Sequence, residues 1–459
     1  MNLISLVFSF LKKGMDVGKK VAMISLGCSK NQVDSEVMLG FLKKAGHKIQ
    51  ENPEQAEVVI VNTCAFIKAA KEEALNTIFS LNQLKKKGKI KKIIVAGCLP
   101  ERYRNELPEL LKEGDGFLGP GSIDKIGEII NKTSDRDIVY RAKYKNFLNQ
   151  ASTPRVNLTP RHWAFVKIAD GCNNYCSYCV IPQIRGKYRS RSITSITGEV
   201  KLLVQRGVRE INLISQDTTS YGVDLYGKSK LNHLLCKLVK IKNLKWIRIM
   251  YAHPVHMNDA LLKTIAAEPK ICKYIDLPVQ HISDKILKLM NRKQTGKQII
   301  ELITKIRAII PEITLRSSLI VGFPQETETD FKQLYNFVND VKFNHLGCFT
   351  YSQEEQTKAQ RLKGQIKAKT KKQRYQKIMV LQQKIVNNKN NQLVGQVKEV
   401  LIDQILSKDL ALGRMASDAP EVDGMVYIRG FKNKNLKPGD FQHVRIINSI
   451  VYDLVGEIL

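Results

Sequence analysis

The middle of the chain contains a run of closely spaced cysteines, DGCNNYCSYC at residues 170–179. The run directly follows an apolar segment with the composition of a buried strand, so the cysteines are expected on a loop. Three thiolates this close together can hold three irons of a [4Fe–4S] cluster and leave the fourth iron without a protein ligand. Structural zinc is the alternative, but zinc usually takes four ligands and His162 is poorly placed to supply the fourth. The spacing therefore favours iron–sulfur ligation by Cys172, Cys176 and Cys179.

An iron without a protein ligand gives such a cluster a chemical use. S-adenosylmethionine can chelate the open iron through its amino and carboxylate groups. Electron transfer into the sulfonium then breaks a carbon–sulfur bond and releases methionine and a 5′-deoxyadenosyl radical. The loop alone thus predicts a radical enzyme and leaves its reaction open.

Strand and helix patterns alternate through the centre of the chain, as they do in parallel α/β sheets. Six such units are too few for a closed eight-stranded barrel, so they predict a partial barrel of parallel strands. The strand candidates are Trp163–Ile168, Glu210–Ile214, Trp246–Met250, Tyr274–Leu277, Thr314–Val321 and Leu346–Tyr351.

The first third of the chain shows the same alternation and predicts an open parallel α/β sheet. Each strand candidate is followed closely by a cysteine, and the carboxyl ends of parallel strands meet at one edge of a sheet. Metal ligation by Cys28, Cys64 and Cys98 is therefore favoured over the alternative that they are ordinary core thiols. The strand candidates are Val21–Leu26, Glu57–Val61 and Lys92–Ala96, and the helical patterns are Gln32–Ala45 and Lys68–Lys87.

Three further cysteines, Cys236, Cys272 and Cys348, lie within helix or strand patterns and are interpreted as inert core thiols.

The apolar residues 2–11 are followed, not preceded, by basic residues, and no cleavage site comes next, so a signal peptide is not favoured. We expect translation to begin at Met15 and the protein to be cytoplasmic. No apolar run approaches the ~18–20 residues that span a bilayer, so no membrane partner is expected.

The end of the chain predicts a basic helical stretch, Thr357–Asn391, followed by a small all-β barrel. The helical stretch has eleven basic residues and no acidic one. A solvated face is favoured there over a contact with phosphate. The segment after it is rich in Val and Ile and carries turn signals at Asp423-Gly424 and Pro438-Gly439.

The formal net charge of +31 is unevenly distributed. Residues 390–459 contain eight Lys or Arg and nine Asp or Glu, a net of −1, which leaves +32 on the rest of the chain. A large positive charge suits a polyanionic neighbour such as RNA or a ribosome, although a Lys-rich composition explains it equally well. The nearly neutral terminal domain argues against a tRNA substrate, because phosphate contacts dominate nucleic-acid affinity.

The central loop, with Tyr178 just before its last cysteine, resembles the signature of the radical-SAM superfamily. With the N-terminal cysteines and the β-barrel tail, nearly the whole chain resembles the methylthiotransferases. The resemblance implies that Cys28, Cys64 and Cys98 bind a second [4Fe–4S] cluster and that the tail is a TRAM domain. The implied domains are an N-terminal methylthiotransferase domain at 15–145, a radical-SAM partial barrel at 158–388 and a TRAM substrate-recognition domain at 390–459.

Five short strings resemble one branch of that family, the RimO branch, which modifies the β-carbon of an aspartate in small-subunit ribosomal protein twelve. Two departures, Ser29 for the usual proline and Val279 for a common leucine, touch no proposed ligand. The alternative is a tRNA adenosine methylthiotransferase of the MiaB type, with tRNA the less favoured substrate. The strings are SLGCSKN at 25–31, QDTTSYG at 216–222, LPVQH at 277–281, FTYS at 349–352 and DAPEVDG at 418–424.

The resemblance also implies a reaction that uses two S-adenosylmethionine molecules. One supplies a methyl group to sulfur attached to the N-terminal cluster, and the other gives the radical that removes a hydrogen from the substrate carbon. The expected partners are the ribosomal protein, free or within the ribosome, and an electron donor such as flavodoxin or ferredoxin.

Five residues are expected to contact S-adenosylmethionine. Gln216 and Gln280 follow predicted strands at the mouth of the barrel, where side chains can bond ligand polar groups. The string IVGFPQE at 320–326 resembles the superfamily's turn beside the adenosine, and an ordinary turn after a strand is the alternative. Within it Gly322 would permit close backbone approach, and Glu326 and Tyr178 complete the set.

Overall fold

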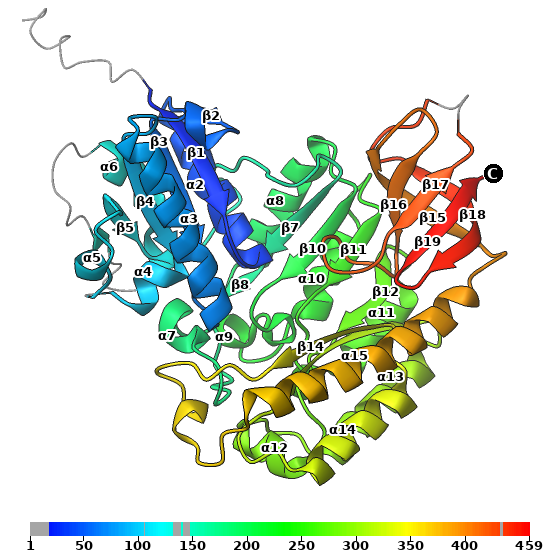
Figure 1. The fold of residues 1–459 in the computed structure, drawn as a ribbon. Coiled ribbons are helices and arrows are strands. Elements are labelled where there is room, and N and C mark those ends of the chain that lie inside the picture. The colour runs from blue at the N-terminus through cyan, green and yellow to red at the C-terminus, as the bar shows by residue number, and fades with distance from the viewer. Residues whose placement is uncertain (1–17, 105, 132–138, 141–146, 432–434) are drawn as a thin grey trace, which may run out of the picture. The chain divides into compact units, whose positions relative to one another are not determined.

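A computed structural model describes residues 18–104, 106–131, 139–140, 147–431 and 435–459 (Figure 1). Met15, the expected start, lies outside the described residues. The chain forms two compact units. The first contains the residues up to Phe147 together with Thr153–Val156, and the second contains Leu148–Ser152 and Asn157–Leu459. Among the helices of the described residues, none is long and apolar enough to cross a membrane.

The N-terminal unit is an open sheet of parallel strands in the order β2-β1-β3-β4-β5-β6. All six residues of β3 are buried, which explains why the strand begins with four consecutive apolar residues, Val58–Val61, and not with an alternating pattern. The predicted open parallel sheet is confirmed. The strands are β1 Lys20–Ser25, β2 Lys48–Gln50, β3 Val58–Thr63, β4 Lys92–Gly97, β5 Gly116–Leu118 and β6 Val139–Tyr140, and the helices are α2 Ser29–Lys44, α3 Lys68–Lys86, α4 Cys98–Arg102, α5 Leu107–Leu110 and α6 Ile126–Asn131.

The second unit begins with a six-stranded parallel sheet in the order β14-β13-β12-β11-β10-β7. The two edge strands do not pair with each other, so the predicted partial barrel is confirmed. One apolar core joins the sheet to seven helices, α8, α10, α11, α12, α13, α14 and α15. The sheet strands are β7 Trp163–Lys167, β10 Glu210–Ile214, β11 Trp246–Ile249, β12 Ile271–Asp276, β13 Thr314–Val321 and β14 His345–Thr350, and Ala169–Asp170 (β8) pairs with Arg189–Ser190 (β9).

The helices of this sheet lie between its strands in sequence. They are α7 Ile181–Arg185, α8 Ile193–Gln205, α9 Val223–Tyr226, α10 Leu231–Leu238, α11 Asp259–Ala267, α12 Asp284–Leu289, α13 Gly296–Ile309 and α14 Glu328–Val341.

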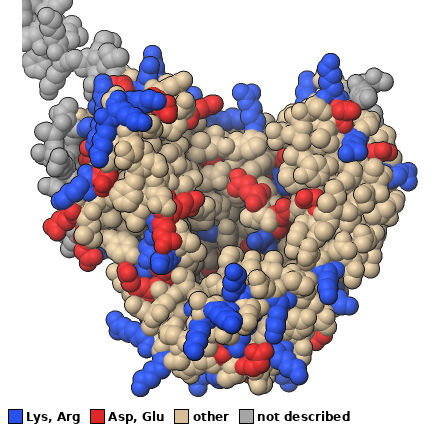
Figure 2. Space-filling model, in the orientation of Figure 1, with Lys and Arg blue, Asp and Glu red and all other residues tan. Residues whose placement is uncertain are grey.

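Helix α15, Ala368–Asn391, follows the last strand of the sheet and leads into a closed β-barrel. The prediction that this helix begins at Thr357 is wrong, because Gly364 adopts φ +73°, a left-handed conformation that interrupts a helix. Basic side chains gather over α14 and α15, with some acidic ones among them (Figure 2). The predicted terminal barrel is confirmed, with strands β15 Val397–Ile405, β16 Ala411–Met415, β17 Val426–Arg429, β18 Phe441–Ile450 and β19 Asp453–Ile458.

Candidate active site

The carboxyl ends of the central strands form one edge of the sheet, here called the carboxyl rim. Parallel strands place their following loops at this edge, which is where enzymes of such folds build their sites. The segments of the rim used below are Cys172–Cys179, Gln216–Ser220, Tyr251–His256, Leu277–His281 and Gly322–Glu326.

The cysteine loop, Cys172–Cys179, is anchored to the end of α12 by hydrogen bonds. Ser177 donates its N–H to the Met290 carbonyl at 3.0 Å and its hydroxyl to the Leu289 carbonyl at 2.7 Å. The Asn291 amide donates to the Tyr175 carbonyl at 2.8 Å. These contacts fix the loop through its backbone and leave the three thiols available as ligands.

The environment of the thiols suits metal ligation. Burial raises the pKa of Cys172 to about 11 and the pKa of Cys179 well above its usual range, so both thiols stay protonated without a bound cation. Asn174 directs its N–H at Cys172 Sγ, 3.5 Å away, and the Arg292 guanidinium lies 4.0 Å from Cys176 Sγ. Both groups stabilise negative charge on sulfur, and three cysteines with these supports fit an iron–sulfur cluster.

Gln216 and Gln280 lie at the rim, as expected from the sequence. Gln216 donates its amide to Asp170 at 3.1 Å, and its Oε1 is buried with no hydrogen-bond partner among the described residues. Gln280 has φ +71°, a strained conformation for a residue other than glycine. Its backbone pairs with Ser318 and Ile320, which holds the residue in this conformation.

Gly322 and Glu326 lie in the turn that follows β13. Gly322 has φ +71°, and a Cβ there would lie 2.3 Å from Lys371 Cγ, so intramolecular packing alone requires a glycine. The Glu326 carboxylate accepts hydrogen bonds from Arg374 at 3.1 Å and from the Phe323 N–H at 2.9 Å. Both of its oxygens are therefore engaged within the turn, and its contact with S-adenosylmethionine stays a prediction.

Tyr178 packs edge-to-face on Phe323, with ring centroids 6.4 Å apart. The Phe323 ring in turn contacts Tyr351. Tyr178 thus joins the cysteine loop to the turn after β13, the two segments that the sequence assigned to one ligand.

The N-terminal sheet brings its own cysteines to the carboxyl ends of three adjacent strands. Cys28 precedes α2, Cys64 follows β3 and Cys98 begins α4. A Cβ on Gly27 would lie 2.7 Å from Cys64 Cβ and 3.3 Å from Cys64 Sγ, so the loops of Cys28 and Cys64 are in close contact. Gly27 has φ +91°, which only glycine adopts without strain.

Asn31, on the first turn of α2, ties these three loops together. Its amide donates to the Leu26 carbonyl at 3.1 Å and to the Thr63 carbonyl at 2.9 Å. Cys98 Sγ lies 3.6 Å from its Oδ1, and the side chain is fully buried. Asn31 therefore positions all three cysteine-bearing segments, as a buried residue supporting a metal site does.

Asn31, Asn174 and Arg292 were not singled out from the sequence. The first two lie next to cysteines, and that adjacency is the only signal that could have indicated them. Arg292 is 116 residues from Cys176 and is brought to it by the fold alone.

Of the other cysteines, Cys272 and Cys348 are buried as predicted, but Cys236 is exposed because α10 turns only its leucines toward the core.

The opposite edge of the central sheet, the amino rim, binds the C-terminal barrel through buried ion pairs. Arg414 of β16 contacts Glu210 at 2.8 Å and Asp403 at 2.7 Å, and His162 lies 2.8 Å from Asp403. Glu210 also meets Arg248 at 3.2 Å. The charges compensate one another and dock the barrel against the strand beginnings.

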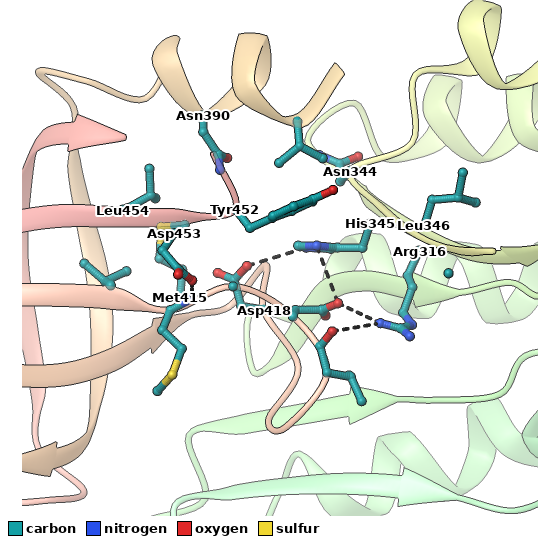
Figure 3. A pocket seen from close by; sticks show the side chains of 17 residues that line it. Arg316, Asn344, His345, Leu346, Asn390, Met415, Asp418, Tyr452, Asp453 and Leu454 are labelled. Atoms are coloured by element: carbon teal, nitrogen blue, oxygen red, sulfur yellow. Dashed lines mark hydrogen bonds and ion pairs between the residues drawn. The ribbon is translucent and has the colours of Figure 1, made fainter. Parts of the chain in front are cut away.

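The string at 418–424 belongs to this same interface (Figure 3). Asp423 accepts hydrogen bonds from Arg316 and Tyr274, each at 2.7 Å, and His345 lies 3.5 Å from both Asp418 and Asp423. Burial alone would raise the pKa of Asp423, but His345 and Arg316 hold it below its usual range. The acidic residues of the string thus have partners within the protein.

Three family models match the chain, and their order follows the architecture. They are the uncharacterised protein family UPF0004 at residues 20–119, the radical SAM superfamily at residues 166–338 and the TRAM domain at residues 394–459. A ribosomal protein uS12 methylthiotransferase RimO from Clostridioides difficile (strain 630) is 45% identical over 440 residues, which cover 96% of this chain and 99% of the relative. The chain belongs to the RimO family of radical SAM methylthiotransferases. The resemblance stated from the sequence is confirmed.

Further relatives support the family assignment. The RimO of Desulforamulus reducens is 47% identical over 441 residues, with 95% of this chain and 99% of the relative covered. The RimO of Geobacter sulfurreducens is 46% identical over 444 residues, with 96% and 99% covered.

Among solved structures, the radical S-adenosylmethionine methyltransferase TsrM from Kitasatospora setae matches with a TM-score of 0.51 and 14% identity over 72% of this chain and 73% of TsrM. The cobalamin-dependent enzyme OxsB also gives a TM-score of 0.51, at 13% identity over 83% of this chain and 57% of OxsB. At these identities the likeness concerns the fold alone.

Proposed function

We propose that this protein transfers a methylthio group to the β-carbon of an aspartate in small-subunit ribosomal protein uS12. The observation that carries the proposal is the presence of two cysteine triplets, each at the carboxyl ends of its own parallel sheet. Family membership over nearly the full chain supports the same reaction. In this proposal the N-terminal domain, at 15–145, carries the sulfur chemistry and the radical-SAM domain, at 158–388, generates the radical. The TRAM domain is proposed at 390–459.

In this proposal Cys172, Cys176 and Cys179 hold one [4Fe–4S] cluster, and Cys28, Cys64 and Cys98 hold the second. When bound, the two clusters and S-adenosylmethionine supply a carbon radical that removes a hydrogen atom and a sulfur that receives a methyl group.

The chain's own residues prepare this chemistry at the carboxyl rim. Arg292 offsets negative charge at Cys176, and Asn174 donates toward Cys172. Gln216 offers a buried oxygen that accepts a donor such as an ammonium group, because its amide is already used by Asp170. Gln280, Gly322 and the ring of Tyr178 complete the proposed S-adenosylmethionine site.

The proposed partners are uS12, free or within the ribosome, and a cytoplasmic electron donor such as flavodoxin or ferredoxin. The test uses full-length protein reconstituted anaerobically with iron and sulfide, then incubated with S-adenosylmethionine, a reductant and either uS12 or tRNA. Mass spectrometry should find one methylthio group on the uS12 aspartate and none in digested tRNA. A methylthio group found only in the tRNA digest would contradict the proposal.

A further inference from the structure

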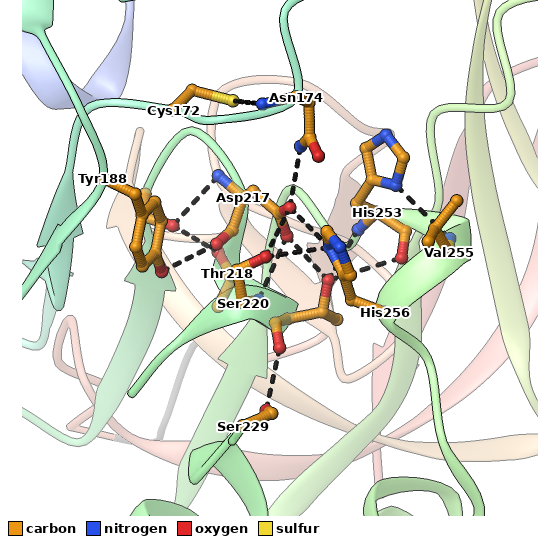
Figure 4. A network of polar contacts seen from close by, with 12 residues as sticks. Cys172, Asn174, Tyr188, Asp217, Thr218, Ser220, Ser229, His253, Val255 and His256 are labelled. Carbon is orange, nitrogen blue, oxygen red and sulfur yellow. Dashed lines mark hydrogen bonds and ion pairs between the residues drawn. The ribbon is translucent and has the colours of Figure 1, made fainter. Parts of the chain in front are cut away.

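An aspartate and two histidines form a polar cluster at the carboxyl rim that the proposed chemistry leaves without a role. Asp217 follows β10, and His253 and His256 follow β11, the neighbouring strand. Their potential ligand atoms lie within 4.8 Å of one another. Figure 4 shows Asn174, Ser220 and His256 converging on Asp217.

Asp217 is saturated with hydrogen bonds. Its Oδ1 accepts from the Thr219 hydroxyl at 2.7 Å and the Ser220 N–H at 3.2 Å. Its Oδ2 accepts from Asn174 at 2.8 Å, the Ser220 hydroxyl at 2.8 Å and His256 Nδ1 at 2.7 Å. Burial alone would raise the pKa of Asp217, but the bond from His256 and the two nearby imidazoles hold it well below its usual range. Asp217 is therefore an ionised group that orients its neighbours.

This arrangement fixes His256. Because an ionised carboxylate only accepts, the proton between the two residues belongs to His256 Nδ1. The opposite nitrogen, Nε2, bonds to no residue in the described part of the chain, and 31% of the side chain is exposed. Nε2 of His256 is therefore available to a ligand at the carboxyl rim.

His253 lies beside it, with ring centroids 5.2 Å apart. Its Nδ1 accepts the Val255 N–H at 3.3 Å, and burial lowers its pKa to about 3, so the ring is neutral with its proton on Nε2. That Nε2 is buried and has no partner among the described residues. A buried donor without an acceptor is costly unless a ligand supplies one.

The cluster is connected directly to the proposed radical site. Asn174 donates its side-chain amide to Asp217 and its backbone N–H toward Cys172. One residue therefore sets the distance between the histidines and the cysteine loop. A substrate held by the histidines would therefore lie beside the cysteine loop.

We propose that the carboxylate of the substrate aspartate binds between His253, which donates its Nε2–H, and His256, which takes the imidazolium form in the complex because Asp217 accepts the Nδ1 proton and the substrate carboxylate accepts the Nε2 proton. This inference rests on the proposed function. The β-carbon of aspartate is bonded directly to that carboxylate, so anchoring the carboxylate places the reacting carbon one bond away. A metal ion is the less suitable occupant, because both Asp217 oxygens are already used by five donors.

The test variant is His256→Asn, whose side-chain amide occupies the position of Nδ1 and preserves the bond to Asp217 while removing Nε2. The reconstituted full-length protein is assayed with a uS12 peptide containing the aspartate and with the same peptide carrying asparagine. KM for the aspartate peptide should rise about ten- to a hundredfold, as for loss of a hydrogen bond to a charged group. The wild type should prefer aspartate over asparagine, and the variant should lose that preference.

Two comparisons exclude a structural explanation. His256→Gln carries an amide nearer the position of Nε2 and should recover part of the lost affinity. His233→Asn, on the exposed face of α10, is the matched control and should behave as the wild type. In His233→Asn, formation of 5′-deoxyadenosine without peptide should also stay within about twofold of the wild type, because this residue lies outside the proposed site.

An unchanged KM, or a preference for aspartate that survives in His256→Asn, would overturn the inference while leaving the proposed function intact. A stoichiometric extra metal that is lost in His256→Asn would also overturn it, in favour of a metal site. A wild type that modifies tRNA and leaves uS12 unmodified would overturn the proposed function as well.

Discussion

The two rims of the central sheet differ in how their buried charged and polar groups are paired within the protein. At the amino rim, charged side chains from the sheet and the C-terminal barrel meet opposite charges, as Glu210 does with Arg248 and Arg414. At the carboxyl rim, the described residues leave Gln216 Oε1 and the Nε2 atoms of His253 and His281 buried without partners. Buried groups are normally hydrogen-bonded. Arg248 Nη2 at the amino rim also lacks a partner among the described residues, but the Arg248 charge is compensated by Glu210, whereas the unpaired atoms at the carboxyl rim lie on the side of the sheet that carries the cysteine loop. The amino rim therefore supports the fold, and the carboxyl rim is where the proposed chemistry is located.

The largest effect should come from Cys176→Ala at the carboxyl rim. Removing this thiol should abolish one cluster and lower product formation more than about 10³-fold, because the loop then keeps only two of its three thiol ligands. The unfolding free energy of the metal-free protein should change little. Iron content, 5′-deoxyadenosine yield and urea unfolding measure the three quantities. Cys236→Ala, at an exposed cysteine on α10, is the control and should leave all of them unchanged.

The next largest effect should come from Arg414→Met at the amino rim. This change leaves Glu210 and Asp403 buried without their shared cation and should lower the unfolding free energy by about 3–5 kcal/mol. Iron content per folded molecule should stay constant. Urea denaturation checks the stability, and adding Glu210→Gln to the same protein should restore part of it. A loss below about 1 kcal/mol would show that the amino rim contributes little to stability.

A smaller effect should appear with pH. The pKa values of Asp423, Asp403 and Glu210 are lowered in the folded protein; burial opposes this, and neighbouring His and Arg groups prevail. A carboxyl group with a lowered folded pKa stabilises the protein above its unfolded pKa, and this contribution is lost as pH falls from about 4.5 through the folded value. Asp423→Asn should remove up to about 1 kcal/mol of the difference in unfolding free energy between pH 6 and pH 3, because the unfolded carboxyl titrates near 3.8. If the difference in unfolding free energy between the two pH values is unchanged in this variant, Asp423 does not stabilise the protein through the ion-pair network.

Much of the fold could be predicted because periodicity and apolar runs report burial directly. Strands β10 and β13 have the predicted bounds, and the cysteines after β1, β3 and β4 lie at adjacent strand ends. The short strands β2, β5 and β6 were missed, since two or three residues carry no period. The basic stretch was extended too far because composition does not reveal the left-handed conformation of Gly364.

The site was predicted where its residues share one loop or directly follow predicted strands. The cysteine loop is local, whereas Arg292, Asp217 and His256 reach it through the parallel order of strands far apart in the chain. The string at 418–424 shows the converse. Its resemblance to one branch was recognised, but Asp418 and Asp423 turn out to be engaged with His345 and Arg316. A pattern shows that residues matter and does not show which partner they meet.

The central claim is that the two cysteine triplets each hold a cluster, and iron analysis of the anaerobically reconstituted protein tests it most directly. The account predicts about eight irons per chain in the wild type and about four when Cys28, Cys64 and Cys98 are all replaced by alanine. It also predicts that these three thiols resist alkylation in the reconstituted wild type. About four irons in both proteins, with Cys28, Cys64 and Cys98 freely alkylated in the wild type, would contradict it.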